Sequence, residues 1–191
     1  METFLFEVAQ RLKQEHPNDL DKVCVVFNNR RPTVFLKDQF KKNSSNAFFL
    51  PTMISMDELV KKMGGMEIIP NEFLLFELYD IHRNIEKKED VDSFEKFISI
   101  ADMMMADFSE IDLYLVDPQE IFSNLSDIKA IGEWDIEGHP ITPMQQRYLA
   151  FYKSLYTYYA QLHTRLESQH KAYSGMAYRH VAENIDSMID T

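Results

Sequence analysis

The sequence KVCVVFNNRRPTVFLKDQFKK, residues 22–42, joins an apolar strand to an amphipathic helix. The unbroken apolar run from Val23 to Phe27 is typical of a strand that is covered on both faces of a parallel sheet. Two asparagines end the run, and Pro32 suits the first turn of a helix whose apolar positions are Val34, Phe35, Leu36 and Phe40. The pattern predicts a strand–turn–helix unit in which Cys24 is a small core residue.

The turn of this unit carries Arg30 and Arg31. In open α/β sheets, ligands bind beyond the carboxyl ends of the strands, and a helix N-terminus at that place favours an anion. The two arginines, with the Thr33 hydroxyl and Lys37, are therefore expected to contact the backbone phosphates of single-stranded DNA. The alternative is that the two arginines are solvated turn residues, because surface charges need no special explanation.

The remainder of the first 66 residues also alternates helices and strands. We expect an amphipathic helix over 3–15 and a polar loop, KNSSN, at 42–46. A second short strand is expected over Ala47–Leu50, and Ser55 with Glu58 forms a capping-box pattern for the next helix. Two strands that each lead into a helix predict part of a parallel sheet.

From residue 67 onward, the pattern is helical almost throughout. Helix-start signals are found at Pro70, at Asp92 with Glu95, at Asp117 with Pro118 and Glu120, and at Thr142 with Pro143 and Gln145. The helix expected over 144–166 carries a stripe of tyrosines and leucines, which core packing explains better than base stacking. Loops are expected at EKKED, residues 86–90, and at 128–140, which holds Trp134. The fold class is therefore α/β, with a partial parallel-sheet lobe at 1–66 and a mostly α-helical lobe at 67–191.

The distribution of charge limits the kinds of partner. The chain of 191 residues has a net charge of −11, which argues against a general nucleic-acid-binding surface. The acidic side chains are concentrated in residues 67–137, whose net charge is −14. Residues 30–42, in contrast, have a net charge of +4. A local basic spot at the turn is therefore compatible with an acidic protein.

Cysteine usage and hydropathy indicate the compartment. The single cysteine excludes an internal disulfide, which fits a reducing environment. No run of 18 apolar residues is present, and the first residues contain acids and break after a few apolar positions. We therefore expect neither a membrane span nor a secretory signal, and a cytoplasmic location.

Motifs for catalysis or cofactor binding are not recognisable in the sequence. The five glycines form neither GxxxxGK[ST] nor GxGxxG, and the histidines lack the HExxH spacing of zinc enzymes. In DFSEID, the carboxylates of Asp107, Glu110 and Asp112 lack the ligand ladder of a calcium loop, and helix capping by Ser109 explains them better. We expect no cofactor, no metal and no catalytic residue in this chain.

Four stretches resemble a known family in their order along the chain. They are VCVVFNNRRPTVFLKDQF at 23–40, FFLPTMISMDELV at 48–60, SFEKFISIADMMMADFSEIDLYLVD at 93–117, and LYTYYAQLHTRLESQHKAYSGMAYRHVAE at 155–183. Together they resemble the N-terminal part of the inactivated-helicase, nuclease-bearing subunit (AddB/RexB type) of bacterial helicase–nuclease complexes. Such complexes process DNA double-strand ends for recombinational repair, and this subunit pairs with an active helicase subunit.

The resemblance implies a RecA-like (1A-type) lobe at 1–66 and a 1B-type helical lobe at 67–191. Arg30 and Arg31 would then occupy the place of helicase motif Ia, which contacts the single-strand backbone. Two features depart from the pattern, because METFLFEVAQRLKQ replaces the phosphate loop and no segment matches the PD-(D/E)XK nuclease motif.

Two hypotheses about function follow from the sequence. In the first, the chain is a noncatalytic part of a DNA-end-processing subunit that contacts single-stranded DNA and docks a helicase subunit. In the second, the acidic helices at 67–137 form a protein–protein interaction module without nucleic-acid contact. A positive groove from Arg30 and Lys37 toward Arg165, Lys171 and Arg179 would favour the first, and isolated positive points would favour the second.

Overall fold

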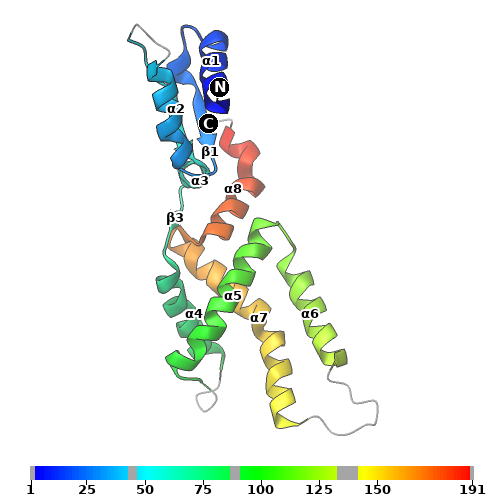
Figure 1. Cartoon of the computed structure of the whole chain (residues 1–191). Helices are drawn as coiled ribbons and strands as arrows, with labels where there is room; N and C mark the ends of the chain where they lie inside the picture. The colour runs from blue at the N-terminus through cyan, green and yellow to red at the C-terminus, as the bar shows by residue number, and fades with distance from the viewer. Residues whose placement is uncertain (1–2, 43–46, 87–90, 133–141, 190–191) are drawn as a thin grey trace. The chain divides into compact units, whose positions relative to one another are not determined.

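The computed structural model describes residues 3–42, 47–86, 91–132 and 142–189. The chain divides into an N-terminal unit, Met1–Met63, and a helical unit, Gly64–Thr191. This division falls close to the boundary predicted after residue 66. The described residues are mostly helical, and their strands form two short parallel pairs (Figure 1).

The N-terminal unit contains α1 (Phe4–Glu15), the 3₁₀ turn η1 (Leu20–Lys22), β1 (Cys24–Phe27), α2 (Arg31–Lys42), β2 (Thr52–Ser55) and α3 (Met56–Gly64). Strands β1 and β2 pair in parallel, with Cys24 opposite Thr52 and Phe27 opposite Ser55. Each strand leads into a helix, so the strand–turn–helix unit and the parallel pairing expected from the sequence are both confirmed.

The second strand does not lie where the sequence predicted it. Residues Ala47–Leu50 are not a strand, and β2 begins only after Pro51. Proline has no amide hydrogen, so the first ladder donor is the amide of Thr52, which donates to the carbonyl of Val23 at 2.8 Å. The capping box after β2 is confirmed, because the Glu58 carboxylate accepts from the Ser55 amide at 2.8 Å.

The core of the N-terminal unit is small. Its hydrophobic cluster, formed by Ala9, Leu20, Leu36 and Phe40, lies on one face of the strand pair, and Ile54 and Val60 are buried outside this cluster. Strand β1 contains no fully buried residue, and Cys24 is exposed. The prediction of a strand covered on both faces with Cys24 in the core is therefore wrong. Alternate side chains of a strand face opposite sides, and the cluster formed by α1 and α2 covers only the side of Val23, Val25 and Phe27.

The helical unit contains β3 (Glu67–Ile68), α4 (Asn71–Ile85), α5 (Phe94–Leu113), α6 (Pro118–Gly132), α7 (Pro143–Ser168), β4 (Lys171–Ala172) and α8 (Ser174–Ile189). Helix α7 packs against α4 and α6, and α5 packs against α4 and α8. The two-residue strands β3 and β4 pair in parallel. They join the start of this unit to the segment between its last two helices (Figure 1).

Most of the predicted helix starts in this unit are confirmed. The Glu120 amide donates to Asp117 at 2.9 Å, and Thr142 with Gln145 forms a complete capping box. The start at Asp92 is wrong by one residue, because Ser93 occupies the N-cap without a side-chain cap bond. The loop predicted at 128–140 is wrong for 128–132, which belong to α6. Trp134 and most of the KNSSN and EKKED loops lie outside the described residues.

The tyrosine and leucine stripe of α7 is core in its C-terminal half. Leu155, Tyr159, Leu162 and Leu166 are buried, together with Tyr158, which the sequence analysis did not include. Tyr148, near the start of the helix, is 39% exposed. Core packing is therefore confirmed for these residues, although not for the whole stripe. Among the described residues, no helix is long and apolar enough to cross a bilayer.

Candidate functional site

The predicted binding residues lie at one edge of the N-terminal unit. Because β1 and β2 are parallel, their carboxyl ends meet at the same edge, with Phe27 opposite Ser55. From this edge the chain enters α2 at Arg31 and α3 at Met56. We call residues 28–31 and 55–58 the strand-end edge. Two helix N-termini lie there, and helix N-termini favour anionic groups. Some of their amides are already bonded, because the Arg31 amide donates to Asn29 and the Glu58 amide donates to Ser55.

Arg30 is already paired at this edge. Its guanidinium donates to a carboxylate oxygen of Glu58 at 2.6 Å, although its side chain is 79% exposed. The other Glu58 oxygen accepts from Ser55, and the Ser55 amide and the Arg30 charge together lower the pKa of Glu58. Glu58 therefore stays ionised and competes with any phosphate for Arg30.

Arg31 and Thr33 lie in the first turn of α2. The amide of Arg31 donates to the side-chain oxygen of Asn29 at 3.0 Å, which orders the turn and leaves the Arg31 side chain exposed. The Thr33 side chain is half-buried. Lys37 is exposed but lies more than one helical turn further along α2. The structure therefore brings Arg30, Arg31 and Thr33 to one edge and leaves Lys37 away from it.

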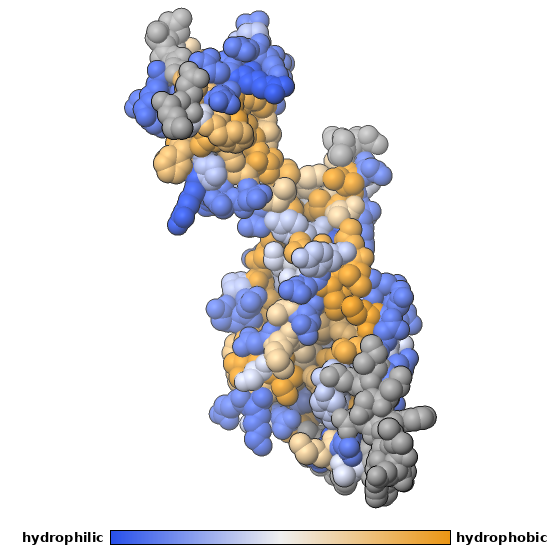
Figure 2. All heavy atoms as spheres, turned by 45° about the vertical axis from the view of Figure 1, so that its right-hand side comes forward, coloured by the Kyte–Doolittle hydropathy of each residue, from blue (hydrophilic) through white to orange (hydrophobic). Residues whose placement is uncertain are grey.

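The outer face of α2 is more apolar than an ordinary solvated helix face. Leu36 and Phe40 are buried, whereas Val34 and Phe35 are 68% and 60% exposed. Positions 36 and 40 share one face of a helix, and positions 34 and 35 fall on the other side of it. Helical periodicity in the sequence was therefore enough to distinguish the buried pair, Leu36 and Phe40, from the exposed pair, Val34 and Phe35. On the face of the N-terminal unit shown in Figure 2, hydrophobic side chains gather between hydrophilic ones.

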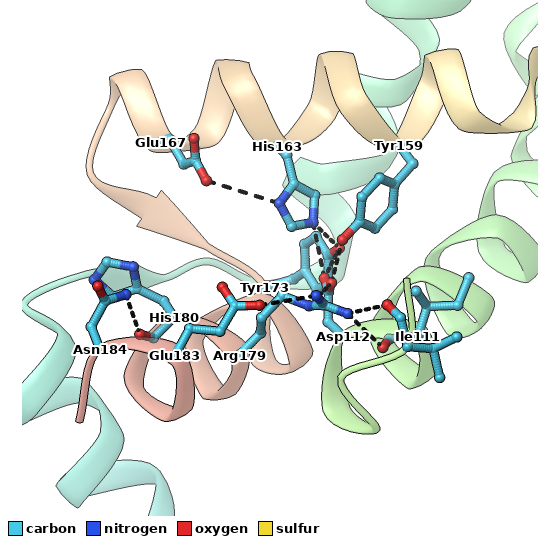
Figure 3. Close-up of polar contacts among 11 residues, drawn as sticks. Ile111, Asp112, Tyr159, His163, Glu167, Tyr173, Arg179, His180, Glu183 and Asn184 are labelled. Atoms are coloured by element: carbon cyan, nitrogen blue, oxygen red, sulfur yellow. Dashed lines mark hydrogen bonds and ion pairs between the residues drawn. The ribbon is translucent and has the colours of Figure 1, made fainter. Parts of the chain in front are cut away.

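A second constellation surrounds the buried carboxylate of Asp112 in the helical unit. Asp112 belongs to the last turn of α5, and Tyr159 and His163 point toward it from α7 (Figure 3). Tyr173 and Arg179 approach from the α8 side (Figure 3). We call these five residues the Asp112 cluster.

Each oxygen of Asp112 has two partners. Tyr159 donates to Oδ1, and Arg179 Nε lies 2.9 Å from the same oxygen. Tyr173 donates to Oδ2, which His163 Nε2 approaches to 2.9 Å. The Arg179 Nε–H is not aligned with a hydrogen-bond acceptor, so its contact with Asp112 is an ion pair.

The electrostatics of the cluster keep Asp112 ionised. Burial alone would raise the pKa of Asp112, but the hydrogen bonds and charge of His163, with the two tyrosine hydroxyls, lower it below its usual range. Burial and the Asp112 carboxylate raise the pKa of Tyr159 and Tyr173, so both remain hydrogen-bond donors. A carboxylate with all its partners in place offers neither a free base nor a nucleophile. The cluster therefore fastens α5, α7 and α8 to one another.

From the sequence, capping of a helix by Ser109 was expected to explain the acidic residues of DFSEID, 107–112. Ser109 lies within α5 and not at a helix start, so the helix-capping explanation of DFSEID is wrong. Among the described residues, no group of three or more acidic, histidine or cysteine side chains is placed to hold a metal ion. The sequence did contain a signal for this cluster. Asp112 shares the apolar, buried face of α5 with Phe108 and Ile111, and an acidic residue on such a face indicates a buried polar contact.

Two arginines of the helical unit, Arg165 and Arg179, are paired with acidic side chains. Arg165 pairs with Glu77 at 2.9 Å and with Asp80 at 2.6 Å. Arg179 pairs with Asp112 and Glu183. Within this unit, the described arginines at positions 165 and 179 are therefore isolated positive points and do not form part of a positive groove.

Comparison with known proteins adds no family. No protein-family model matches the chain, and no curated protein matches it significantly.

Proposed function

We propose that the chain is the noncatalytic N-terminal part of a helicase–nuclease subunit that processes DNA ends in double-strand break repair. The strand-end edge contacts the backbone of single-stranded DNA, and the remainder of the chain docks an active helicase subunit. The proposed DNA-end processing takes place in the bacterial cytoplasm. A nuclease of the PD-(D/E)XK type would belong to sequence beyond the 191 residues.

One observation carries the DNA-binding part of the proposal. Two parallel strands deliver two helix N-termini to one edge, where the exposed Arg31 stands. Amides at helix N-termini and a guanidinium together suit a phosphate group. Among the described residues, the Arg31 side chain has no acidic partner, in contrast to Arg30. Arg31 is therefore the main phosphate contact, with Thr33 beside it, while Arg30 contributes little as long as Glu58 holds it.

The family proposal rests on the resemblance of four stretches in one order, which include the NRR turn at 29–31, the DFSEID run at 107–112 and the AYSGMAYR ending at 172–179. A RecA-like lobe is a larger parallel sheet than the pair found here, so the N-terminal unit corresponds to its first part only. Phosphate contacts of this kind position a strand without reading its sequence.

A second function is favoured by a different observation. Arg165 and Arg179 are both paired with acidic side chains, so neither is free to bind a phosphate. Residues 67–137 have a net charge of −14, which suits an acidic protein-interaction module. We assign this role to the helical unit, and it is compatible with DNA contact by the N-terminal unit. If DNA binding is absent, it is the whole function.

The test is a titration of fluorescent single strands of several sequences with the chain at low ionic strength. We expect binding to all of them, and a loss of affinity in Arg31→Ala that is about equal for every sequence. Arg165→Ala is the control, because Glu77 and Asp80 already hold that guanidinium. Failure of every strand to bind, or a loss confined to one sequence, would contradict the proposal.

A further inference from the structure

The turn between α5 and α6 has an unusual backbone for the residue that it contains (Figure 1). Leu115 has φ of 54°, in the left-handed region that glycine normally occupies. The Leu115 amide donates to the Asp112 carbonyl at 3.1 Å, and the Val116 amide donates to the Ile111 carbonyl at 3.0 Å. These two bonds define a Schellman helix end, in which the position of Leu115 usually holds glycine.

The side chain that causes this strain is not used for core packing. Leu115 is 50% exposed, and its neighbours Leu113 and Tyr114 are 51% and 73% exposed. We call these three residues the apolar turn. A glycine would adopt this backbone without strain, although it would lose the half of Leu115 that is buried.

The backbone on both sides of the apolar turn is hydrogen-bonded to Arg179. The Arg179 guanidinium donates to the carbonyls of Ile111, at 3.0 Å, and of Val116 (Figure 3). The same arginine is paired with Asp112, which the rest of the Asp112 cluster fixes. The buried polar cluster therefore presents a rigid apolar turn, and a preorganised surface loses little entropy on binding.

The charge around the turn identifies the chemistry of its partner. Residues 97–128 contain seven acidic side chains and no basic one, and of the seven only Asp112 is buried, where it pairs with Arg179 beneath the turn. Glu110, Asp117 and Glu120 are exposed on either side of the turn in the sequence. A surface with an apolar centre and an acidic surround is complementary to a basic amphipathic segment.

We propose that the apolar turn is a docking surface for a partner protein segment whose apolar side chains are flanked by lysine or arginine. The inference rests on the proposed function, because it locates the subunit docking assigned to the helical unit. It does not depend on DNA contact by the N-terminal unit.

The test uses the full chain and a fluorescent helical peptide built from leucine and lysine, with a leucine–glutamate twin of the same apolar pattern. We expect the lysine peptide to bind and the glutamate peptide not to bind. Leu115→Gly should weaken the binding of the lysine peptide about tenfold, since a contact with one leucine side chain is lost. Relief of the backbone strain offsets the loss of the half-buried side chain, so the variant should remain folded in urea denaturation at the concentration and temperature of the titration, and unfolding cannot account for the loss.

His170→Gly is the matched control. His170 also has φ of 54° and lies at the end of α7, so this variant relieves the same strain at an unrelated helix end. It should bind the lysine peptide as the wild type does. Equal binding of both peptides, no binding of either, or equal loss in both glycine variants would overturn the proposal. A concentration-dependent dimer that Leu115→Gly abolishes would assign the surface to a second copy of the chain and would also overturn it.

DNA titrations on Leu115→Gly separate this inference from the proposed function. The apolar turn has no part in the DNA contact, so the variant should bind single strands as the wild type does. A parallel loss of DNA binding in Leu115→Gly would contradict a separate docking surface.

Discussion

At the scale of single residues, Asp112 has the largest set of buried partners described in the helical unit. It is fully buried, and its two oxygens receive Tyr159, Tyr173, His163 and Arg179. Removing one member of a buried ion pair is costly, because the remaining charge stays buried without compensation.

Asp112→Asn should therefore lower the free energy of unfolding by about 3–5 kcal/mol. Asparagine keeps the size of the side chain but leaves Arg179 without its buried counter-charge. Urea denaturation followed by circular dichroism measures the change. Asp107→Asn, on the same helix, is the control and should change stability by less than about 0.5 kcal/mol. Equal stability of Asp112→Asn and wild type would show that the cluster does not hold the helices together.

His82 predicts a pH dependence. Its Nε2 accepts from the Asp92 amide at 3.3 Å, its Nδ1 lies 2.7 Å from the Tyr158 hydroxyl, and its ring stacks on Phe97. Since Nε2 is an acceptor, the ring is neutral. Burial lowers the pKa of His82 below the ordinary value of 6.5, which outweighs the nearby charges of Glu86 and Asp92.

The unfolded chain binds a proton at His82 below about pH 6.5, whereas the folded chain resists it. The stability that depends on neutral His82 is therefore complete above that pH and is lost as the pH falls through the lowered pKa. We expect the free energy of unfolding to decrease from neutral pH toward about pH 5. His82→Gln should flatten this slope, and the exposed His170→Gln should not. A slope that persists unchanged in His82→Gln would contradict the assignment.

At the scale of elements, α8 begins unusually close to α5. A Cβ atom on Gly175 would meet the backbone of Ser109, so this position accepts no side chain unless the helices separate. The close approach also brings Tyr173 and Arg179 within reach of Asp112.

Gly175→Ala should lower the free energy of unfolding by about 1–3 kcal/mol, because the clash involves backbone atoms that cannot rotate away. The exposed neighbour Ser174→Ala provides the comparison and should stay within about 0.5 kcal/mol of the wild type. Both values follow from chemical denaturation. A Gly175→Ala variant as stable as the wild type would mean that α5 and α8 do not pack as described.

Local signals in the sequence were sufficient for most elements. Capping patterns at Ser55, Asp117 and Thr142 predict helix starts correctly, because a cap depends on residues three positions apart. The exposure of Cys24 was not predictable, since it depends on how many elements cover each face of the strand pair. The pairing of β3 with β4 joins two-residue segments from opposite ends of the helical unit, and nothing local marks it.

The candidate sites show the same limit. The NRR turn indicated the strand-end edge, but the pairing of Arg30 with Glu58 depends on the register of β1 against β2. The partners of Asp112 lie on α7, on α8 and in the segment between β4 and α8. An acid on a buried helix face was the only local signal for the Asp112 cluster, and it does not reveal the partners.

At the scale of the whole molecule, the two units have cores of unequal size. The N-terminal unit depends on a buried cluster of four residues and would be marginal on its own, as domains of about 60 residues usually are. The helical unit buries far more apolar side chains, among them Phe97, Phe108, Leu162 and Leu166.

Thermal unfolding should therefore show two transitions, with the N-terminal unit melting first. Phe40→Ala, in the small core, should lower the first transition only, and Asp112→Asn should lower the second only. Differential scanning calorimetry resolves the two. A single transition that both variants shift equally would show that the units unfold together.

The central claim is that the strand-end edge binds the phosphate backbone of single-stranded DNA through Arg31. The most direct measurement is the slope of log affinity against log salt concentration, compared among the wild type, Arg31→Ala and Arg30→Ala. Each phosphate neutralised on a single strand contributes about 0.7 to this slope. We predict that Arg31→Ala reduces its magnitude by about 0.7, and that Arg30→Ala leaves it nearly unchanged because Glu58 holds that guanidinium. An unchanged slope in Arg31→Ala would contradict the claim and return Arg31 to the role of a solvated turn residue.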